Sequence, residues 1–210
     1  MKRIIIFSIF LVCAFSIQAQ ELRVIKLNAP DKTRGSAIMK ALNDRQSIRE
    51  YKPESLRPQD LSDLLWAANG INRPDGRRTA PSARNLQEVD MYVIFPEGAY
   101  RYDPKEHALI PVSAGDFRGA VAANQDFAKE APLSIVLVAD MSKHANMSES
   151  NKLTAAIDVG IVCQNINIAC AGLGLATVPR GIMDQAALRT ALKLSDHHLL
   201  LMNNPVGYPK

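Results

Sequence analysis

The segment from residue 149 to residue 171 constrains the fold more than any other part of the chain. If it is a helix, apolar residues such as Ile157, Ile161 and Ile166 lie on nearly every side of it. A helix of this length spans about 33 Å, and a helix with so little polar surface must be buried. Gly172 and Gly174 follow and end it. We therefore expect a fold built around a long buried central helix that also packs against a second subunit.

The elements around this helix mix helices and strands without regular alternation. Helical patterns cover 36–43, a segment that opens at Pro58 and ends at Gly70, 117–128, and a segment that begins at Asp184. Strand patterns cover 91–95, 99–102, 108–112, 133–139, 175–178 and 198–202. The first three strands are close enough for an antiparallel meander, and 133–139 is apolar throughout, as in an interior strand. This order favours an α+β fold over a doubly wound parallel sheet.

The first residues have the features of a secretory signal peptide. Lys2 and Arg3 precede an apolar run over 4–17, and Gln18-Ala19 closes it. The run is shorter than the roughly 20 residues of a membrane-spanning helix, so we expect no stable membrane anchor. The sequence predicts a signal peptide over 1–19, export to the periplasm, an exposed leader over 20–35 and a single domain over 36–210.

Composition excludes several classes of function. Without residues 1–19 the chain has 23 of its 25 basic residues and all 21 acidic ones, a net charge of 23 − 21 = +2, so we expect no nucleic-acid partner. The four histidines lack metal-ligand spacing, and we expect no bound metal. Cys163 and Cys170 are about 10 Å apart on a helix and should be unbridged.

No familiar catalytic motif of a hydrolase or nucleotide-binding protein is present. Gly172-Leu173-Gly174 follows a helix, whereas a dinucleotide-binding glycine loop lies between a strand and the helix it opens. The sequence has no Gly-x-Ser-x-Gly elbow and no P-loop. We expect chemistry carried by a cofactor, with no catalytic side chain of the protein's own.

Arg45-Gln46-Ser47-Ile48-Arg49 offers a ladder of polar groups. If 45–51 is extended, Arg45, Ser47 and Arg49 lie on one side, with the two arginines about 13 Å apart. Pro53 disfavours helical geometry at Lys52 and supports extension. That spacing is close to the length of flavin mononucleotide (FMN) from phosphate to pyrimidine.

Together with other segments, this ladder resembles the nitroreductase family. The matching segments, in order, are Pro81-Ser82 with Asn85 and Gln87, Gly160 with Gln164-Asn165, 171–175, 178–181 and 205–209. The resemblance covers 38–209. Residues 65–70 and 101–104 are similar to the branch related to the dehydrogenases of azole-forming peptide pathways.

The resemblance implies an FMN-binding fold with a central, mostly antiparallel sheet flanked by helices, in an intertwined homodimer. It implies that Arg45, Gln46 and Ser47 hold the phosphate and ribityl end of FMN, while Arg49 reaches the pyrimidine edge. It further implies that the ring meets two other groups: Pro81, Ser82, Ala83, Asn85 and Gln87 from the partner subunit, and Pro179, Arg180 and Gly181, with a backbone N–H near N5. Outside this family, Asn85 would be a helix cap and Arg180 a surface residue. The family usually continues past its Gly-Tyr-Pro element, and its tail often adds a Lys or Arg to the phosphate site. Here either Lys210 or another basic residue supplies that cation, or FMN is held more loosely than usual.

Three functions are compatible with these residues. The leading one is an exported FMN-dependent oxidoreductase that works by a ping-pong mechanism, from a reductant such as NAD(P)H to a nitro, quinone or similar small-molecule acceptor. The second is an FMN-dependent dehydrogenase of a peptide-like or small organic substrate. The third is a flavin-binding protein without turnover.

Overall fold

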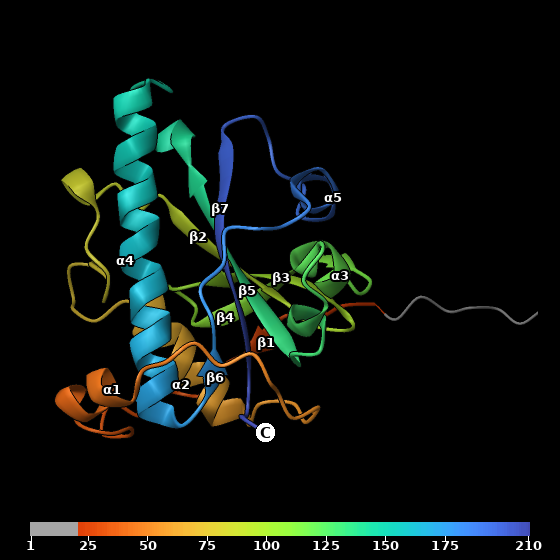
Figure 1. Cartoon of the computed structure of the whole chain (residues 1–210). Helices are drawn as coiled ribbons and strands as arrows, with labels where there is room; N and C mark the ends of the chain where they lie inside the picture. The colour runs from red at the N-terminus through yellow and green to blue at the C-terminus, as the bar shows by residue number, and fades with distance from the viewer. Residues whose placement is uncertain (1–20) are drawn as a thin grey trace, which may run out of the picture.

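The computed structural model describes residues 21–210 (Figure 1), so the signal peptide expected over 1–19 lies outside the described residues. Seven strands form one sheet. They are β1 (Ile25–Lys26), β2 (Val89–Ile94), β3 (Gly98–Asp103), β4 (Ala108–Ala114), β5 (Leu133–Asp140), β6 (Ala176–Thr177) and β7 (His198–Gly207). Their order is β1-β4-β3-β2-β5-β7-β6, and every pairing between these strands is antiparallel. The predicted α+β class and the 91–112 meander are confirmed.

Helices cover both faces of the sheet. They are α1 (Ile38–Asp44), α2 (Pro58–Asn69), α3 (Arg118–Ala122), α4 (Glu149–Leu173) and α5 (Gln185–Ala191). Single 3₁₀ turns occur at Ala83–Asn85, Asp126–Lys129 and Met141–Lys143. α2 and α4 pack on one face, and α3 and α5 on the other (Figure 1).

The side chains of β5 show why its sequence is apolar at every position. Ile135 and Leu137 point into the core beneath α2 and α4, while Val136 and Val138 point into the core beneath α3 and α5. All four are fully buried. Because successive residues of a strand face opposite sides, a strand covered on both faces needs apolar residues throughout.

α4 is the long helix that the sequence predicts, and its ends are capped locally. The Ser148 side chain accepts the Asn151 N–H at its start, and Gly174 ends it in the left-handed conformation, φ +72°. One side of α4 packs on the sheet and α2, yet Leu153 and Ile157 are 64% and 57% exposed. Among the described helices, α4 alone has the length and hydropathy to cross a membrane, but it is partly buried against this core. A single chain therefore covers only part of its apolar surface.

The helix expected over 117–128 is wrong in its second half. The chain leaves α3 at Ala123, where φ is +51° and ψ is −111°, and continues as the 3₁₀ turn Asp126–Lys129. The buried guanidinium of Arg180 donates to the carbonyl oxygens of Val121 and Ala122, at 3.0 and 2.9 Å. In a continuing helix, Val121 and Ala122 would accept from the N–H groups of the next turn, so a distant side chain provides a cap that local sequence does not reveal.

Two further boundaries differ from the prediction. The last strand was expected to end at Met202, but β7 continues to Gly207 and pairs with β5 through Pro205 and Val206. The leader is mostly exposed, but β1 pairs with β4, and Leu22, Ile25 and Leu27 pack against the main core. The leader is thus attached to the sheet by alternating apolar residues.

Asp60 on α2 joins the leader and the C-terminal segment. Its fully buried carboxylate accepts hydrogen bonds from Arg34 at 2.5 Å, from Arg57 at 2.8 Å and from the Tyr208 hydroxyl at 2.6 Å. Burial alone would raise the pKa of Asp60, but the hydrogen bonds from Arg57, Tyr208 and Arg34 outweigh it and lower the pKa to about 2. This carboxylate fixes three segments at one point.

The substitution Asp60→Ala should lower the free energy of unfolding by about 3 kcal/mol at neutral pH, because two arginines and a hydroxyl lose their shared acceptor. A lowered pKa stabilises the folded state above the unfolded value of about 3.9, and this contribution is lost as the pH falls toward 2. Urea unfolding at several pH values checks both points. The control is Lys26→Ala in the exposed Lys26–Glu106 pair, expected within about 0.5 kcal/mol of wild type. An equally small change for Asp60→Ala would contradict the assignment.

Candidate functional site

The segment 45–51 is non-helical and lies along the end of the sheet (Figure 1). The Ile48 N–H donates to the carbonyl oxygen of Thr177 on β6 at 3.0 Å, and Tyr51 forms a β-bridge with Pro209. Ile48 is half-buried and Tyr51 is fully buried, whereas Arg45, Ser47 and Arg49 are exposed. The apolar residues hold the segment to the sheet, and its basic residues face outward.

Gly207 lets this segment approach closely. A Cβ atom on Gly207 would lie 2.7 Å from Pro132 Cδ and 3.3 Å from Tyr51 Cβ, too near for any larger residue. The Tyr51 hydroxyl in turn donates to the Ile48 carbonyl oxygen at 3.0 Å. The Gly-Tyr-Pro element therefore has a packing role beneath the exposed arginines.

Two of the three predicted groups of site residues meet in one chain. A cleft of about 230 Å³ is bordered by Arg49 on one side and by Pro179, Arg180 and Gly181 on the other. Gln125 and Phe127 also line it, and neither was singled out in the sequence. The Phe127 ring lies 5.9 Å from the Arg49 guanidinium and 5.6 Å from that of Arg180, within the range of cation–π attraction.

Arg180 is a buried structural residue, and the alternative of a surface residue is wrong. It is 6% exposed, and its guanidinium also donates to Gln125 Oε1 at 2.9 Å and to Asn203 Oδ1 at 2.7 Å. Burial lowers its pKa, although Tyr51 opposes this. The Arg180 N–H donates to the Asn203 carbonyl oxygen at 2.8 Å. If a backbone N–H reaches a ring in this cleft, it therefore comes from exposed Gly181 and not from Arg180.

The basic residues of the 45–49 segment are free to meet an anion. Within residues 21–210, neither Arg45 nor Arg49 has a carboxylate within 4 Å. Lys210, the other candidate cation, lies 3.7 Å from Glu130 Oε2. The donor set of Arg45, Ser47 and Arg49 thus fits a phosphate-bearing ligand, because two arginines and a hydroxyl supply charge and directed N–H and O–H donors.

The third predicted group, the loop over residues 81–87, is a strained turn beside α4. Arg84, Asn85 and Gln87 all have positive φ, between 52° and 55°. The Ala83 N–H donates to Asp158 Oδ2 on α4 at 2.8 Å, and the Gln87 N–H donates to Ser82 Oγ at 2.8 Å. Lys143 Nζ donates to the Gln87 carbonyl oxygen at 2.8 Å. Such conformations persist when surrounding contacts hold them, and they are frequent at functional sites.

This loop does not join the other two groups within one chain. It contacts α4 at Asp158, whereas the 45–51 segment contacts Thr177, just beyond the end of α4 at Leu173. About 24 Å of helix axis separate Asp158 from Gly174. Figure 1 shows the loop beside the upper half of α4 and the 45–51 segment crossing its lower end. Within one chain, the 81–87 loop and the cleft at Arg49 therefore lie at separate positions along α4.

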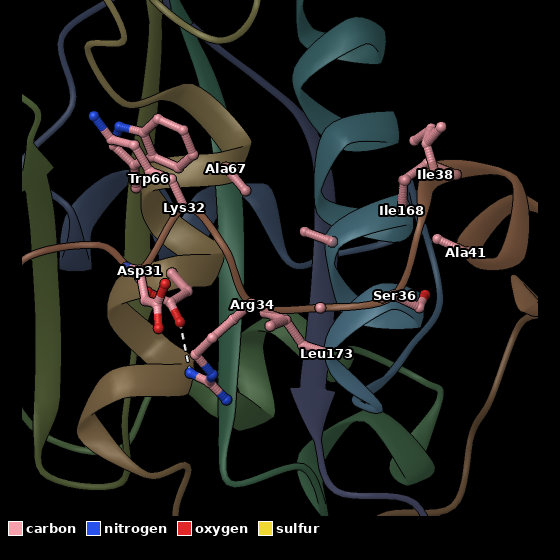
Figure 2. Close-up of a pocket in the computed structure, with 14 residues that line it drawn as sticks. Asp31, Lys32, Arg34, Ser36, Ile38, Ala41, Trp66, Ala67, Ile168 and Leu173 are labelled. Carbon is pink, nitrogen blue, oxygen red and sulfur yellow. Dashed lines mark hydrogen bonds and ion pairs between the residues drawn. The ribbon is translucent and has the colours of Figure 1, made fainter.

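A second cleft, of about 200 Å³, was not predicted. It lies between the 31–36 segment, α1, α2 and α4 (Figure 2). Lys32 lies over the Trp66 ring at 5.3 Å at one end, and Ile38 and Ile168 lie at the other. Ile38 is 61% exposed, so the apolar surface of the cleft continues onto α1.

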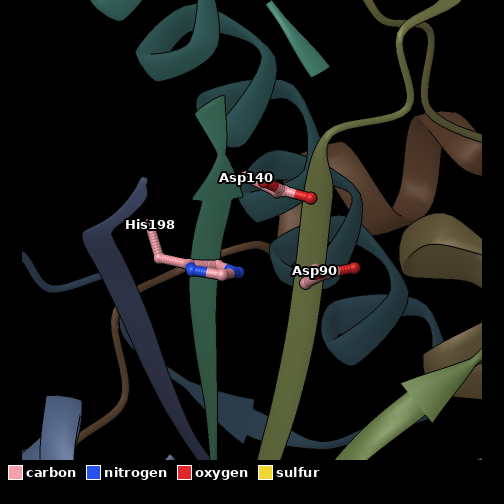
Figure 3. A group of neighbouring side chains, drawn as sticks. All are labelled: Asp90, Asp140 and His198. Atoms are coloured by element: carbon pink, nitrogen blue, oxygen red, sulfur yellow. The ribbon is translucent and has the colours of Figure 1, made fainter. Parts of the chain in front are cut away.

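Asp90, Asp140 and His198 come together at the end of the sheet (Figure 3), where one possible ligand atom of each lies within 4.8 Å of the others. The three residues come from β2, β5 and β7, which is why sequence spacing did not reveal the grouping. Burial raises the pKa of Asp90, while Lys143, Arg101 and Arg78 oppose this. Lysine and arginine side chains of the protein therefore already offset part of the negative charge of Asp90, and we assign no ligand to this group of three residues.

Comparisons with known proteins agree with this geometry. The chain matches the nitroreductase family over residues 42–208 and belongs to it. A crystal structure of a nitroreductase from Ralstonia eutropha is 36% identical, with a TM-score of 0.84, and the match covers 90% of each chain. A nitroreductase of Methanocaldococcus jannaschii is 31% identical over 78% of this chain and 86% of that protein.

FMN is the cofactor of relatives in this family. A crystal structure of a nitroreductase from Desulfovibrio desulfuricans contains FMN; it is 22% identical, with a TM-score of 0.60, and the match covers 83% of this chain and 87% of the other. At that identity the likeness shows the fold alone. The expected nitroreductase fold and the FMN cofactor of the family are both confirmed.

The substitution Arg180→Ala should lower the free energy of unfolding by about 3 kcal/mol, because four oxygen acceptors, three of them in buried hydrogen bonds, lose the guanidinium. Arg180→Lys should recover only part, since an ammonium keeps the charge but cannot reproduce the planar fork. Thermal and urea unfolding measure both variants. An Arg180→Ala protein as stable as wild type would show that the guanidinium does not hold α3 and β7 together.

Proposed function

We propose that this protein is an exported, homodimeric, FMN-dependent oxidoreductase that works by a ping-pong mechanism. The observation that carries the proposal is exposed Arg49 at a cleft that Pro179, Arg180 and Gly181 also line, with Arg45 exposed four residues earlier on the same segment. Bound FMN would accept a hydride from a reductant such as NAD(P)H and pass electrons to a nitro, quinone or similar small acceptor. The signal peptide expected over 1–19 supports export to the periplasm.

Each group of residues has a separate task in this proposal. Arg45 and Ser47 bind the phosphate end, where a guanidinium can make two parallel N–H bonds. Arg49 would lie next to the pyrimidine edge and stabilise negative charge there, which favours the reduced form. The Gly181 N–H would be the backbone donor toward N5. No side chain of the cleft has to act as a general acid or base, since water can supply protons.

A homodimer completes the site in this proposal. The 81–87 loop is too far from the cleft of its own chain, so a partner subunit must bring its copy of the loop to the ring. Two helices have exposed apolar residues that such a partner would cover: Ile38, Met39 and Leu42 on α1, and Leu153 and Ile157 on α4. A two-fold dimer gives two equivalent sites, each built from both chains.

The branch motif over 65–70 gives no preference for a peptide-like substrate. A Cβ atom on Gly70 would lie 2.5 Å from Trp66 Cδ1, and the Trp66 indole N–H donates to the Ile71 carbonyl oxygen at 3.0 Å. The motif thus has a packing role at the end of α2. We therefore place the reductase first, ahead of a dehydrogenase of the azole-forming branch and ahead of a flavin carrier without turnover.

The cofactor assignment predicts the behaviour of Arg45→Ala. The protein expressed as residues 20–210 should carry FMN with its visible absorption bands, and Arg45→Ala should lose at least tenfold in FMN affinity, because the phosphate loses a bidentate cation. Arg45→Lys should lose less, and Arg23→Ala in the leader should bind as wild type. Fluorescence titration of FMN measures the affinities. Unchanged FMN affinity in Arg45→Ala would contradict the assigned role.

Mixed dimers test whether the two half-sites come from different chains. Arg45→Ala and Asn85→Ala subunits should each form flavin-poor homodimers. In a heterodimer of the two, one site carries both substitutions and the other carries neither, so about one FMN per dimer should bind with wild-type affinity. Flavin counts on tagged, purified heterodimers measure this. If both residues served one site within a single chain, the heterodimer would bind as weakly as the parents.

A further inference from the structure

A buried group of three titratable residues lies directly behind the 81–87 loop. Glu88 follows the loop, His144 follows the turn after β5, and Asp158 lies in the middle of α4. Glu88 is 0% exposed, Asp158 4% and His144 7%. His144 Nε2 lies 3.4 Å from Glu88 Oε1, and Asp158 Oδ2 accepts the Ala83 N–H. None of the three has a role in the proposed electron transfer.

The group lacks ordinary hydrogen-bond donors. Within residues 21–210, both carboxyl oxygens of Glu88 and both ring nitrogens of His144 have no hydrogen-bond partner. A buried ionised carboxylate without a donor is unfavourable, so Glu88 is better accommodated as the acid. Burial is the largest cause and raises the pKa of Glu88; hydrogen bonding to Asp158 and the charge of Asp158 raise it further, whereas the backbone N–H of Glu88 and the nearby His144 lower it. The acid form gives Glu88 an O–H, which would be the donor for a hydrogen bond to the Asp158 carboxylate.

The loop in front of this group needs such a support. Three of its residues have positive φ without being glycine, which costs backbone energy unless fixed contacts compensate. The Asp158 carboxylate is the one acidic group of α4 beyond its first turn, and it holds the loop at the N–H of Ala83. A hydrogen bond to a buried carboxylate is stronger than one to a neutral acceptor.

We propose that Asp158 is a positioning residue for the flavin site, and that a proton held on the buried Glu88 carboxyl group keeps the Asp158 carboxylate on the Ala83 N–H. The part that concerns flavin rests on the proposed function. The flavin ring bound mainly by one subunit would then contact the 81–87 loop of the other subunit. The geometry of that loop would depend on a proton buried in the subunit to which the loop belongs.

The charged groups around the pair set the direction of the pH dependence. Asp158 faces Glu88 from α4, His144 from the turn after β5, and Arg78 from the 71–80 loop, while Lys143 binds the Gln87 carbonyl oxygen. A raised pKa in the folded state stabilises the protonated form, and this contribution is lost as the pH rises through that pKa. Once the Glu88 proton leaves, Glu88 and Asp158 are both charged, and the hold on the loop weakens.

Hydrogen exchange of the flavin-free protein tests the support without requiring any flavin chemistry. In Asp158→Ala the amides of residues 83–87 should lose protection at least tenfold. Asp158→Asn should stay within about threefold of wild type, because its amide oxygen can still accept the Ala83 N–H. Ala83→Pro removes only the donor, and Ser82, with φ −135° and ψ 152°, already has the extended conformation that precedes proline. It should expose the loop as Asp158→Ala does, even if Asp158→Ala folds poorly.

The proton is tested by Glu88→Gln, whose amide donates to Asp158 at every pH. As the pH rises above the ordinary titration range of a glutamic acid, the wild-type loop should lose protection relative to α5, whereas the Glu88→Gln loop should not change. FMN titration of the same variants then tests the role in the site: affinity should fall at least tenfold in Asp158→Ala and in Ala83→Pro but not in Asp158→Asn.

Three results would overturn the proposal: an Asp158→Ala or Ala83→Pro loop as protected as wild type, an Asp158→Asn loop as exposed as that of Asp158→Ala, or a pH response that Glu88→Gln retains. Wild-type protein that binds no FMN would instead refute the proposed function, and the exchange data would still decide whether Asp158 supports the loop.

Discussion

The burial of α4 is the constraint on which the rest of the structure depends. Its 25 residues are apolar on nearly every side, and one chain covers only the side that faces the sheet and α2. Leu153 and Ile157 are exposed, and their burial would contribute a favourable free energy of about 25 cal/mol for each Å² of apolar surface removed from water. The same helix separates the two half-sites along its length. In the proposed dimer, the helix whose exposed side a partner covers would also place one half-site where only the partner's flavin can reach it.

The two segments of the proposed site differ in character: the 45–49 segment provides positive charge, and the 81–87 loop provides a strained backbone. Half-buried Ile48 and buried Tyr51 hold the segment that carries Arg45 and Arg49, so its basic edge stays exposed. The 81–87 loop has the opposite character, because its backbone is strained and a buried carboxylate holds it from within. A basic edge can attract an anionic ligand over a distance, whereas a strained loop can fit a planar ring only if its shape is fixed in advance.

Much of the fold could be predicted because the relevant signals are local. The burial of β5, the capped ends of α4 and the start of α2 at Pro58 follow from hydrophobic pattern and turn residues. What failed depended on contacts between distant residues. The end of α3 depends on Arg180, some 60 residues later in the chain, and the continuation of β7 through Pro205 depends on pairing with β5.

The site could be predicted only in part for the same reason. Family resemblance identified Arg49 and Gly181, which the structure brings to one cleft, but it gave no role to Gln125 or Phe127, which lie beyond the unexpected end of α3. Asp158 could have been singled out from the sequence, because it is the one acidic residue of an apolar helix beyond its first turn. Its partner, the backbone N–H of Ala83, has no sequence signature. The grouping of Asp90, Asp140 and His198 could not be predicted either, because it depends on β2, β5 and β7 being neighbours in the sheet.

The central claim is that groups from two copies of this chain enclose one flavin ring. A crystal structure of the FMN-loaded protein tests it most directly. The account predicts a two-fold dimer in which the phosphate lies at Arg45, the ring lies beside Pro179–Gly181, and the partner's 81–87 loop contacts that ring. A ring enclosed by a single chain, or FMN bound away from Arg45, would contradict it.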